Sequence, residues 1–194
     1  MYDEERILNI LNKGIDRHID ITEKILSTCK DDLLSLSRAC MHSLSEGGKI
    51  LLFGNGGSAS QAEHIAGELV GKFYKVRKPL SAIALTTSST IITATANDTN
   101  FDKIFSRQIE ALGGKGDIAI GLSTSGNSKN VVEGIKKANE LGMYTVAFAG
   151  ETGGALKEVA NLCIRVPSRD TPRIQEMHLL LGHLLCEIIE EVCT

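Results

Sequence analysis

Residues 51–68 read LLFGNGGSASQAEHIAGE and predict a buried strand that turns directly into a helix. The apolar run at 50–53 is short and ends at glycine, which is typical of a strand covered on both faces. Gly54, Gly56 and Gly57 can reach backbone angles closed to most residues, and they leave no side chain between the main chain and a ligand. We therefore expect a ligand site where this strand ends.

The helix after this turn carries a predicted anion site and a pair of titratable side chains. Ser58 is expected to cap its N-terminus, with Gln61 completing a capping box. Free amides and the positive end of the helix dipole then favour an anion or a hydroxylated ligand. His64 and Glu68 are four residues apart on one helix face, so they can serve as an acid–base pair or as metal ligands. A structural histidine beside a solvated carboxylate is the simpler alternative.

The composition is that of an ordinary globular protein. With 194 residues, 42% hydrophobic and 23% charged, the chain suits one domain and indicates neither disorder nor a membrane span. A net charge of −3 and scattered basic residues give no general attraction to nucleic acid. Small anionic ligands are therefore expected to be bound locally.

The N-terminus and the cysteines predict a reduced, cytoplasmic protein. The first residues are acidic and lack the apolar run of a signal peptide. The cysteines form an odd set without a CxxC pair. We expect buried free thiols at Cys29, Cys40, Cys163, Cys186 and Cys193.

Two helices are predicted ahead of the first strand. Apolar residues recur at three- and four-residue steps between 3 and 26, which indicates a long amphipathic helix. A second helix is expected over 31–45, ending at Gly47-Gly48. Because the long leading helix has no place inside a simple alternating α/β unit, we expect it to pack on a neighbouring subunit.

Strands alternate with helices in the rest of the chain. Further strands are predicted at 81–85, 117–122, 145–149 and 162–166, and helices at 86–98, 101–112, 129–141, 153–160 and 171–192. This order predicts an α/β three-layer sandwich with a five-stranded parallel sheet, flavodoxin- or Rossmann-like, that binds ligands beyond the carboxyl ends of its strands. Residues 1–194 then form a single domain, with N-terminal helices at 1–47 and an α/β core at 48–194.

A second polar loop is predicted at the same edge of the sheet. It surrounds Gly126 just before a helix with four hydroxyls, from Ser123, Thr124, Ser125 and Ser128. Hydroxyls and helix amides can bind a phosphate without a lysine. A polar turn with a capping serine is the alternative, but the glycine turn at the same edge favours a phosphate site.

A dinucleotide site is disfavoured by the strand that follows. The pattern Gly54-x-Gly56-x-x-Ala59 fits the relaxed fingerprint. However, the next strand ends at Leu85-Thr86 with no acidic residue to hold a ribose hydroxyl, and a Walker lysine is absent.

Together these motifs resemble the sedoheptulose-7-phosphate isomerase (phosphoheptose isomerase) family of the sugar-isomerase (SIS) domain superfamily. The resemblance covers almost the whole chain, and the motifs agree in order and spacing at 54–58, His64, Glu68, 97–98, 123–128, 173–176 and His183. It implies isomerisation of D-sedoheptulose 7-phosphate to D-glycero-D-manno-heptose 7-phosphate, the first step towards activated heptose for surface polysaccharide such as lipopolysaccharide. It also implies a cytoplasmic homotetramer with one zinc ion per subunit.

The resemblance further implies roles for individual residues. Glu68 and His183 are expected to be the catalytic acid–base pair. Zinc ligands are expected at His64, Glu68, Gln175 and His183. Substrate contacts are expected from Asn55, Gly56, Gly57, Ser58, Glu68, Asn97, Asp98, Ser123, Thr124, Ser125, Ser128 and Gln175. One departure is Thr171-Pro172 ahead of Arg173, where some relatives carry an acidic residue.

An aldose–ketose isomerisation needs one group that moves a proton between neighbouring carbons and another that moves a proton between their oxygens. Glu68 suits the first role and His183 the second, and a metal would stabilise the enediolate by polarising its oxygens. Two alternatives stay open. One is a non-catalytic SIS-domain phosphosugar-binding or replication-initiator-associating regulator, a class without these two side chains, and the other is an isomerase of a different sugar phosphate.

The spacing of Gln175 and His183 predicts shared active sites. Eight residues along one helix correspond to a rise of roughly 12 Å at about 1.5 Å per residue. One zinc ion, with bonds of about 2.0–2.3 Å, can hardly gather both side chains. We therefore expect an obligate oligomer in which His64 and Glu68 come from one subunit and at least one residue of the closing helix comes from a neighbour.

Overall fold

A computed structural model describes residues 2–193 of the chain. Its five strands form one parallel sheet in the order β2-β1-β3-β4-β5. They are β1 (Ile50–Gly54), β2 (Ala82–Ala84), β3 (Ile118–Ser123), β4 (Tyr144–Ala149) and β5 (Leu162–Arg165). The predicted five-stranded parallel sheet is confirmed, and each strand end lies within one residue of its predicted place.

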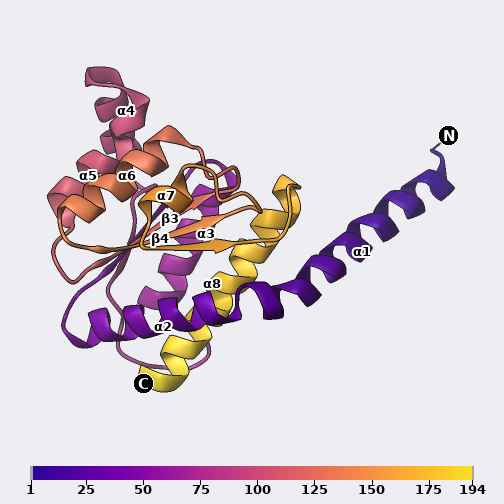
Figure 1. The fold of residues 1–194 in the computed structure, drawn as a ribbon, viewed down its shortest axis with the longest axis horizontal. Coiled ribbons are helices and arrows are strands. Elements are labelled where there is room, and N and C mark those ends of the chain that lie inside the picture. The colour runs from indigo at the N-terminus through magenta and orange to yellow at the C-terminus, as the bar shows by residue number, and fades with distance from the viewer. Residues whose placement is uncertain (1, 194) are drawn as a thin grey trace.

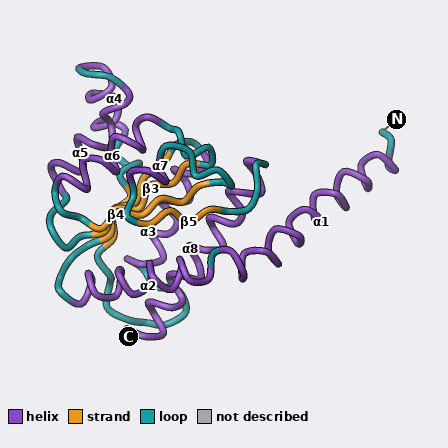
Figure 2. Tube along the Cα trace, viewed as in Figure 1, coloured by secondary structure: helices purple, strands orange, loops and turns teal. Residues whose placement is uncertain are grey.

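Helices cover both faces of this sheet (Figures 1 and 2). One face packs against α2 (Lys30–Ser45), α3 (Gly57–Val70) and α8 (Thr171–Cys193). The other packs against α5 (Ile104–Leu112), α6 (Lys129–Glu140) and the short α7 (Leu156–Val159). Ahead of α5 come α4 (Ser89–Asp98) and the short 3-10 helix η1 (Phe101–Lys103). The predicted α/β three-layer sandwich is confirmed.

The central strand β1 shows how the two cores form. Ile50 and Leu52 belong to the core shared with α2, α3 and α8, whereas Leu51 and Phe53 belong to the core shared with α5 and α6. Successive side chains of a strand point to opposite faces, and both faces are covered here, so all of β1 is buried. This double burial explains the unbroken apolar run in the sequence.

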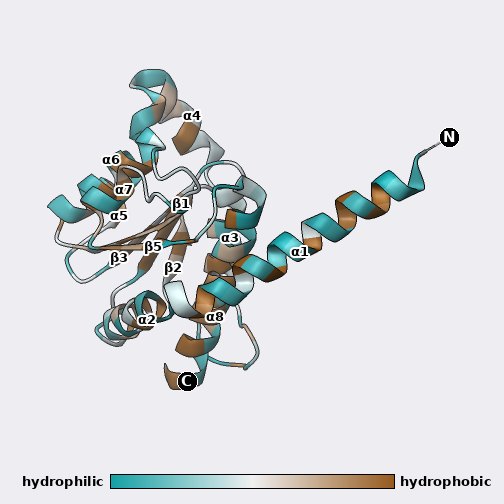
Figure 3. Cartoon of the chain, turned by 45° about the vertical axis from the view of Figure 1, so that its right-hand side comes forward, coloured by the Kyte–Doolittle hydropathy of each residue, from teal (hydrophilic) through white to brown (hydrophobic). Residues whose placement is uncertain are grey.

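The leading helix α1 (Glu4–Thr28) leaves the body of the molecule over most of its length (Figure 1). Only its last turns bury apolar side chains, at Ile21 and Ile25. Figure 3 shows hydrophobic positions recurring along the projecting part. Its apolar side chains that are at least half exposed include Ile7, Leu8, Ile10, Leu11 and Ile15. Neither α1 nor any other helix between residues 2 and 193 has the length and apolar character needed to cross a bilayer.

All five cysteines are free thiols. Cys29, Cys40 and Cys186 are buried, and burial raises the pKa of the Cys186 thiol to about 12. Cys163 is partly buried, and Cys193 is exposed in the last turn of α8. The prediction of buried thiols is therefore wrong for Cys193, because the end of α8 extends beyond the helices that cover its middle.

Candidate active site

The glycine turn joins β1 to α3 as predicted, but the helix begins earlier. Its N-cap is Gly56, which has a φ of +54°, and Ser58 is buried within the first turn. Gln61 completes no capping box, since its amide donates to the main-chain carbonyl of Gln175 in α8. The predicted cap is wrong because a glycine with positive φ starts the helix without a side-chain oxygen.

Helices α3 and α8 lie side by side and run in the same direction. A Cβ built on Gly57 would lie 2.5 Å from Gln175 Nε2, and one built on Gly182 would lie 2.5 Å from Ile65 Cδ1. Gly57 near the start of α3 thus contacts Gln175 near the start of α8, and Ile65, two turns later on α3, contacts Gly182, two turns later on α8. Parallel packing therefore places successive turns of the two helices next to each other.

Three predicted site residues meet along this helix pair. His64 Nε2 lies 2.8 Å from His183 Nε2 and 3.4 Å from Glu68 Oε1. One ligand atom from each residue lies within 4.8 Å of the other two. The side chains of His64 and Glu68 are 48% and 25% exposed, so the cluster can be reached from solvent.

His183 joins this cluster from the same chain, so the prediction that a neighbouring subunit supplies this part of the closing helix is wrong. The rise of α8 separates Gln175 from His183, and each of the two packs beside a different part of α3 in the same chain. Gln175 lies beside Gly57, and His183 lies beside His64, roughly 10 Å further along α3 at about 1.5 Å per residue. Gln175 thus stands between the glycine turn and the cluster.

The cluster fits a zinc ion by its chemistry and spacing. Two imidazole nitrogens and a carboxylate oxygen form a ligand set of catalytic zinc sites, which leave a fourth position to water or substrate. Ligand atoms that share one zinc at about 2.0–2.2 Å lie roughly 3–4 Å apart, close to the 2.8 and 3.4 Å found here.

The hydroxyl loop connects β3 to α6 at the carboxyl edge of the sheet. Ser123 Oγ lies 2.9 Å from Ser128 Oγ and 3.5 Å from Ser125 Oγ. Ser128 is the N-cap of α6, yet its side chain accepts no hydrogen bond from the helix. Gly126 has a φ of +68°, and a Cβ there would collide with the main chain of Gly153. The loop gathers hydroxyls at a helix N-terminus, as a phosphate site requires.

Asn55 and Asn130 tie the two loops together. Their side-chain amides exchange two hydrogen bonds, each 2.8 Å long. Asn55 follows β1, and Asn130 lies in the first turn of α6, so the pair fixes the glycine turn relative to the hydroxyl loop. Asn130 was not predicted from the sequence, because its partner Asn55 is 75 residues away and no local motif links the two.

Two predicted substrate contacts lie elsewhere in the chain. Asn97 and Asp98 are exposed at the end of α4, where the Asn97 amide donates to the Asp98 carboxylate at 2.9 Å. Figure 1 shows α4 projecting from the edge of the molecule. Within a single chain, these residues are not brought to the cluster on α3 and α8.

Comparison with known proteins identifies the family. The chain matches the SIS domain family over residues 15–150. A phosphoheptose isomerase from Aquifex aeolicus is 58% identical over 149 residues, which cover 77% of this chain and 78% of that protein. This chain belongs to the phosphoheptose isomerase family. The resemblance stated from the motifs is confirmed.

Two further relatives extend the match over almost the full length. A probable phosphoheptose isomerase from Thermoplasma acidophilum is 48% identical over 190 residues, covering 98% of this chain and 96% of that protein. The solved structure of a phosphoheptose isomerase from Neisseria gonorrhoeae has a TM-score of 0.91 at 36% identity, covering 96% of this chain and 100% of that one. The chain is therefore an isomerase of the phosphosugar class.

Proposed function

We propose that this isomerase converts D-sedoheptulose 7-phosphate to D-glycero-D-manno-heptose 7-phosphate, a first step towards activated heptose for surface polysaccharide. The observation that carries the proposal is the meeting of His64, Glu68 and His183 within 4.8 Å. These side chains supply a carboxylate and imidazoles for two proton transfers. The relatives are named phosphoheptose isomerases, which supports a heptose phosphate as substrate.

In this proposal Glu68 takes a proton from C1 of the ketose and returns it to C2, with an enediol between the two steps. His183 moves the second proton from the oxygen on C1 to the oxygen on C2. Each proton that leaves the sugar returns to it, so the isomerisation needs no oxidant or reductant. Both side chains lie on packed helices, which hold them in position for the transfers.

The proposed cofactor is one zinc ion, held by His64, Glu68 and His183. Gln175, the fourth expected ligand, has its side-chain amide against Gly57, so this side chain would have to turn towards the cluster to bind the same ion. When bound, zinc would polarise the substrate oxygens as a Lewis acid. The chain itself contributes the arrangement of the ligands, since His64 Nε2 already lies 2.8 Å from His183 Nε2.

The substrate phosphate is assigned to the hydroxyl loop. Ser123, Ser125 and Ser128 direct hydroxyls to one place, and the dipole of α6 favours negative charge there. Thr124 and Ser125 also line a cleft of about 310 Å³. The glycine turn and Gln175 lie between this loop and the cluster, where the polyol chain of the sugar would pass.

A homotetramer is part of the proposal. Its support is the apolar stripe of α1, which no other element of a single chain covers between residues 2 and 193. Exposed apolar surface of this size on a long helix is typical of a protein–protein interface. Asn97 and Asp98, which are remote from the cluster in one chain, would reach a substrate only across such an interface.

The test is turnover of ketose phosphates of different chain length by the zinc-loaded protein. We expect the highest kcat/KM with sedoheptulose 7-phosphate and a large loss with unphosphorylated sedoheptulose. A higher kcat/KM with a five- or six-carbon ketose phosphate would identify a different phosphosugar as the substrate. Binding of these sugars without turnover would support the non-catalytic regulator instead.

A further inference from the structure

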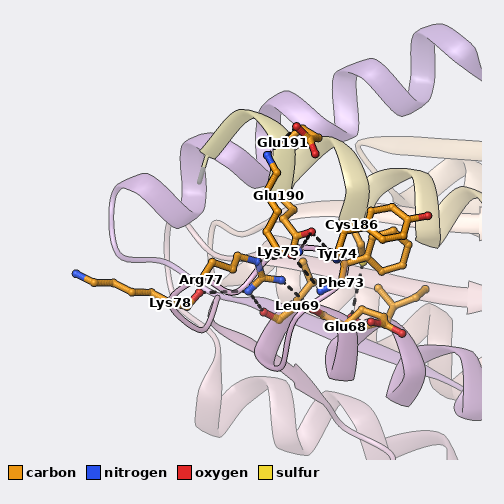
Figure 4. A network of polar contacts seen from close by, with 11 residues as sticks. Glu68, Leu69, Phe73, Tyr74, Lys75, Arg77, Lys78, Cys186, Glu190 and Glu191 are labelled. Carbon is orange, nitrogen blue, oxygen red and sulfur yellow. Dashed lines mark hydrogen bonds and ion pairs between the residues drawn. The ribbon is translucent and has the colours of Figure 1, made fainter.

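The loop between α3 and β2 is held against α8 by one buried carboxylate (Figure 4). Glu190 Oε1 accepts hydrogen bonds from the main-chain N–H of Phe73 at 3.0 Å and from Arg77 Nε at 2.9 Å. Glu190 Oε2 accepts from the main-chain N–H groups of Tyr74 at 2.6 Å and Lys75 at 2.9 Å. The Glu190 and Arg77 side chains are only 1% and 3% exposed. The carboxylate therefore fixes the path of the loop.

Arg77 connects Glu190 to the C-terminal end of α3. Its Nη2 donates to the carbonyl of Glu68 at 2.9 Å, and its Nη1 donates to the carbonyl of Leu69 at 2.8 Å. These carbonyls lie in the last turn of α3, where a cation also complements the helix dipole. Through Arg77, Glu190 is thus connected to the turn of α3 that carries Glu68.

Phe73 connects Glu190 to the cluster of His64, Glu68 and His183. Its ring centroid lies 5.6 Å from that of His183, and its main-chain N–H donates to Glu190. His183 and Glu190 are seven residues apart on α8, two turns along one face. Holding the loop at Glu190 therefore holds the Phe73 ring beside the His183 imidazole. An apolar ring in that place excludes water from one side of the imidazole.

We propose that Glu190 is a positioning residue of the active site: with Arg77 and the loop at 73–77 it forms a clamp that orients Glu68 and, through Phe73, His183. This inference rests on the proposed function of the same cluster. Glu190 itself is not one of the clustered side chains. Burial alone would raise the pKa of Glu190, but hydrogen bonds from Lys75, Tyr74, Phe73 and Arg77 outweigh it and lower the pKa to about 2. The Glu190 carboxyl group is therefore ionised at neutral pH.

A fluorescent reporter tests the position of the loop directly. The chain contains no tryptophan, so Phe73→Trp creates one tryptophan beside His183, which can be excited selectively over the three tyrosines. In that background, Glu190→Gln is expected to move the emission to longer wavelength and to increase quenching by acrylamide. Unchanged emission and quenching would show that Glu190 does not hold the loop.

Zinc affinity and kinetics test the effect on the cluster. In the otherwise unaltered chain, Glu190→Gln should lower zinc affinity, measured by chelator competition, and kcat, each by roughly 10–100-fold, the usual effect of losing a residue that supports metal ligands. KM should change by less than about threefold, because the hydroxyl loop is untouched. Phe73→Ala removes the ring and leaves the Glu190 carboxylate in place. If Glu190→Gln does not fold, a loss of zinc affinity and kcat in Phe73→Ala tests whether the loop positions His183.

Glu191→Gln is the matched control. Glu191 pairs with Lys75 Nζ of the same loop at 2.7 Å, but its side chain is 56% exposed, so little change is expected. Wild-type zinc affinity and kcat in Glu190→Gln or in Phe73→Ala would overturn the proposal. Fluorescence and zinc affinity need no substrate, so they test the clamp even if the wild-type protein fails to isomerise sedoheptulose 7-phosphate, a result that would count against the proposed function alone.

Discussion

At the scale of single residues, Glu68 and His183 carry the proton transfers of the proposed reaction. Glu68→Gln or His183→Asn removes a proton carrier with little change of shape. We expect the fold to persist and kcat to fall by about 10²–10⁴-fold, the usual contribution of a general acid or base. Steady-state kinetics with sedoheptulose 7-phosphate measure the loss, and Glu63→Gln, exposed on the same helix, is the control. Near-full turnover by either variant would show that the acid–base pair is assigned wrongly.

His178 gives the stability of the chain a specific pH dependence. Its Nε2 lies 3.2 Å from the carbonyl of Ala149, and its Nδ1 makes no hydrogen bond within residues 2–193. Burial lowers the pKa of His178 from about 6.5 to about 4, although the hydrogen bond to Ala149 opposes this shift. The unfolded chain therefore binds the proton first, and stability is lost as the pH falls from about 6.5 to about 4.

The shift corresponds to about 3 kcal/mol of unfolding free energy, at about 1.4 kcal/mol per pKa unit. Denaturant titrations of the wild type and His178→Gln at pH 7 and pH 4 measure it. The wild type should lose about 3 kcal/mol more than the variant between the two pH values. Equal losses would mean that His178 does not titrate as described.

Two glutamates show which residues the sequence can reveal. Glu68 follows a glycine turn and shares a helix face with His64, so local spacing was enough to predict a site residue. Glu190 is followed by another glutamate at the end of an amphipathic helix and has no such mark. Its donors lie in a loop more than a hundred residues earlier, as at Phe73, 117 residues away. Only the folded chain brings them together.

At the scale of elements, the hydroxyl loop is expected to act in binding. Ser125→Ala combined with Ser128→Ala removes two of the hydroxyls gathered at the start of α6. Phosphate binding is shared by ground state and transition state, so KM should rise more than kcat falls. Initial-rate kinetics decide this, with the exposed Ser45→Ala as a control remote in sequence. An unchanged KM would show that this loop does not bind the substrate phosphate.

The sheet and its helices could be predicted because each element is encoded by its own periodicity. The start of α3 was misplaced, since Gly56 begins the helix by its backbone angle and leaves no side-chain signal for a cap. The pairing of α3 with α8 could not be predicted either. It depends on where a helix from the end of the chain packs, and contacts such as Gly182 with Ile65 have no local pattern. The error about His183 follows from that missing contact.

At the scale of the whole molecule, each chain holds a complete cluster of His64, Glu68 and His183. Mixing inactive Glu68→Gln with inactive His183→Asn, after dissociation and reassociation, should therefore restore no activity, because every cluster lacks one proton carrier. Two affinity tags verify that mixed oligomers have formed. Recovered turnover in those oligomers would mean that neighbouring chains complete one another's sites.

The apolar stripe of α1 makes the assembly itself testable. Leu11 and Ile15 are 53% and 51% exposed in one chain, so burying their exposed halves in an interface would contribute about 2 kcal/mol per subunit. Leu11→Ser with Ile15→Ser should therefore raise the dissociation constant by roughly 30-fold. Asn9→Ser with Lys13→Ser changes the opposite, polar face of the same helix and should leave assembly unchanged. Sedimentation velocity across a dilution series compares the two variants, and equal assembly would place the interface away from α1.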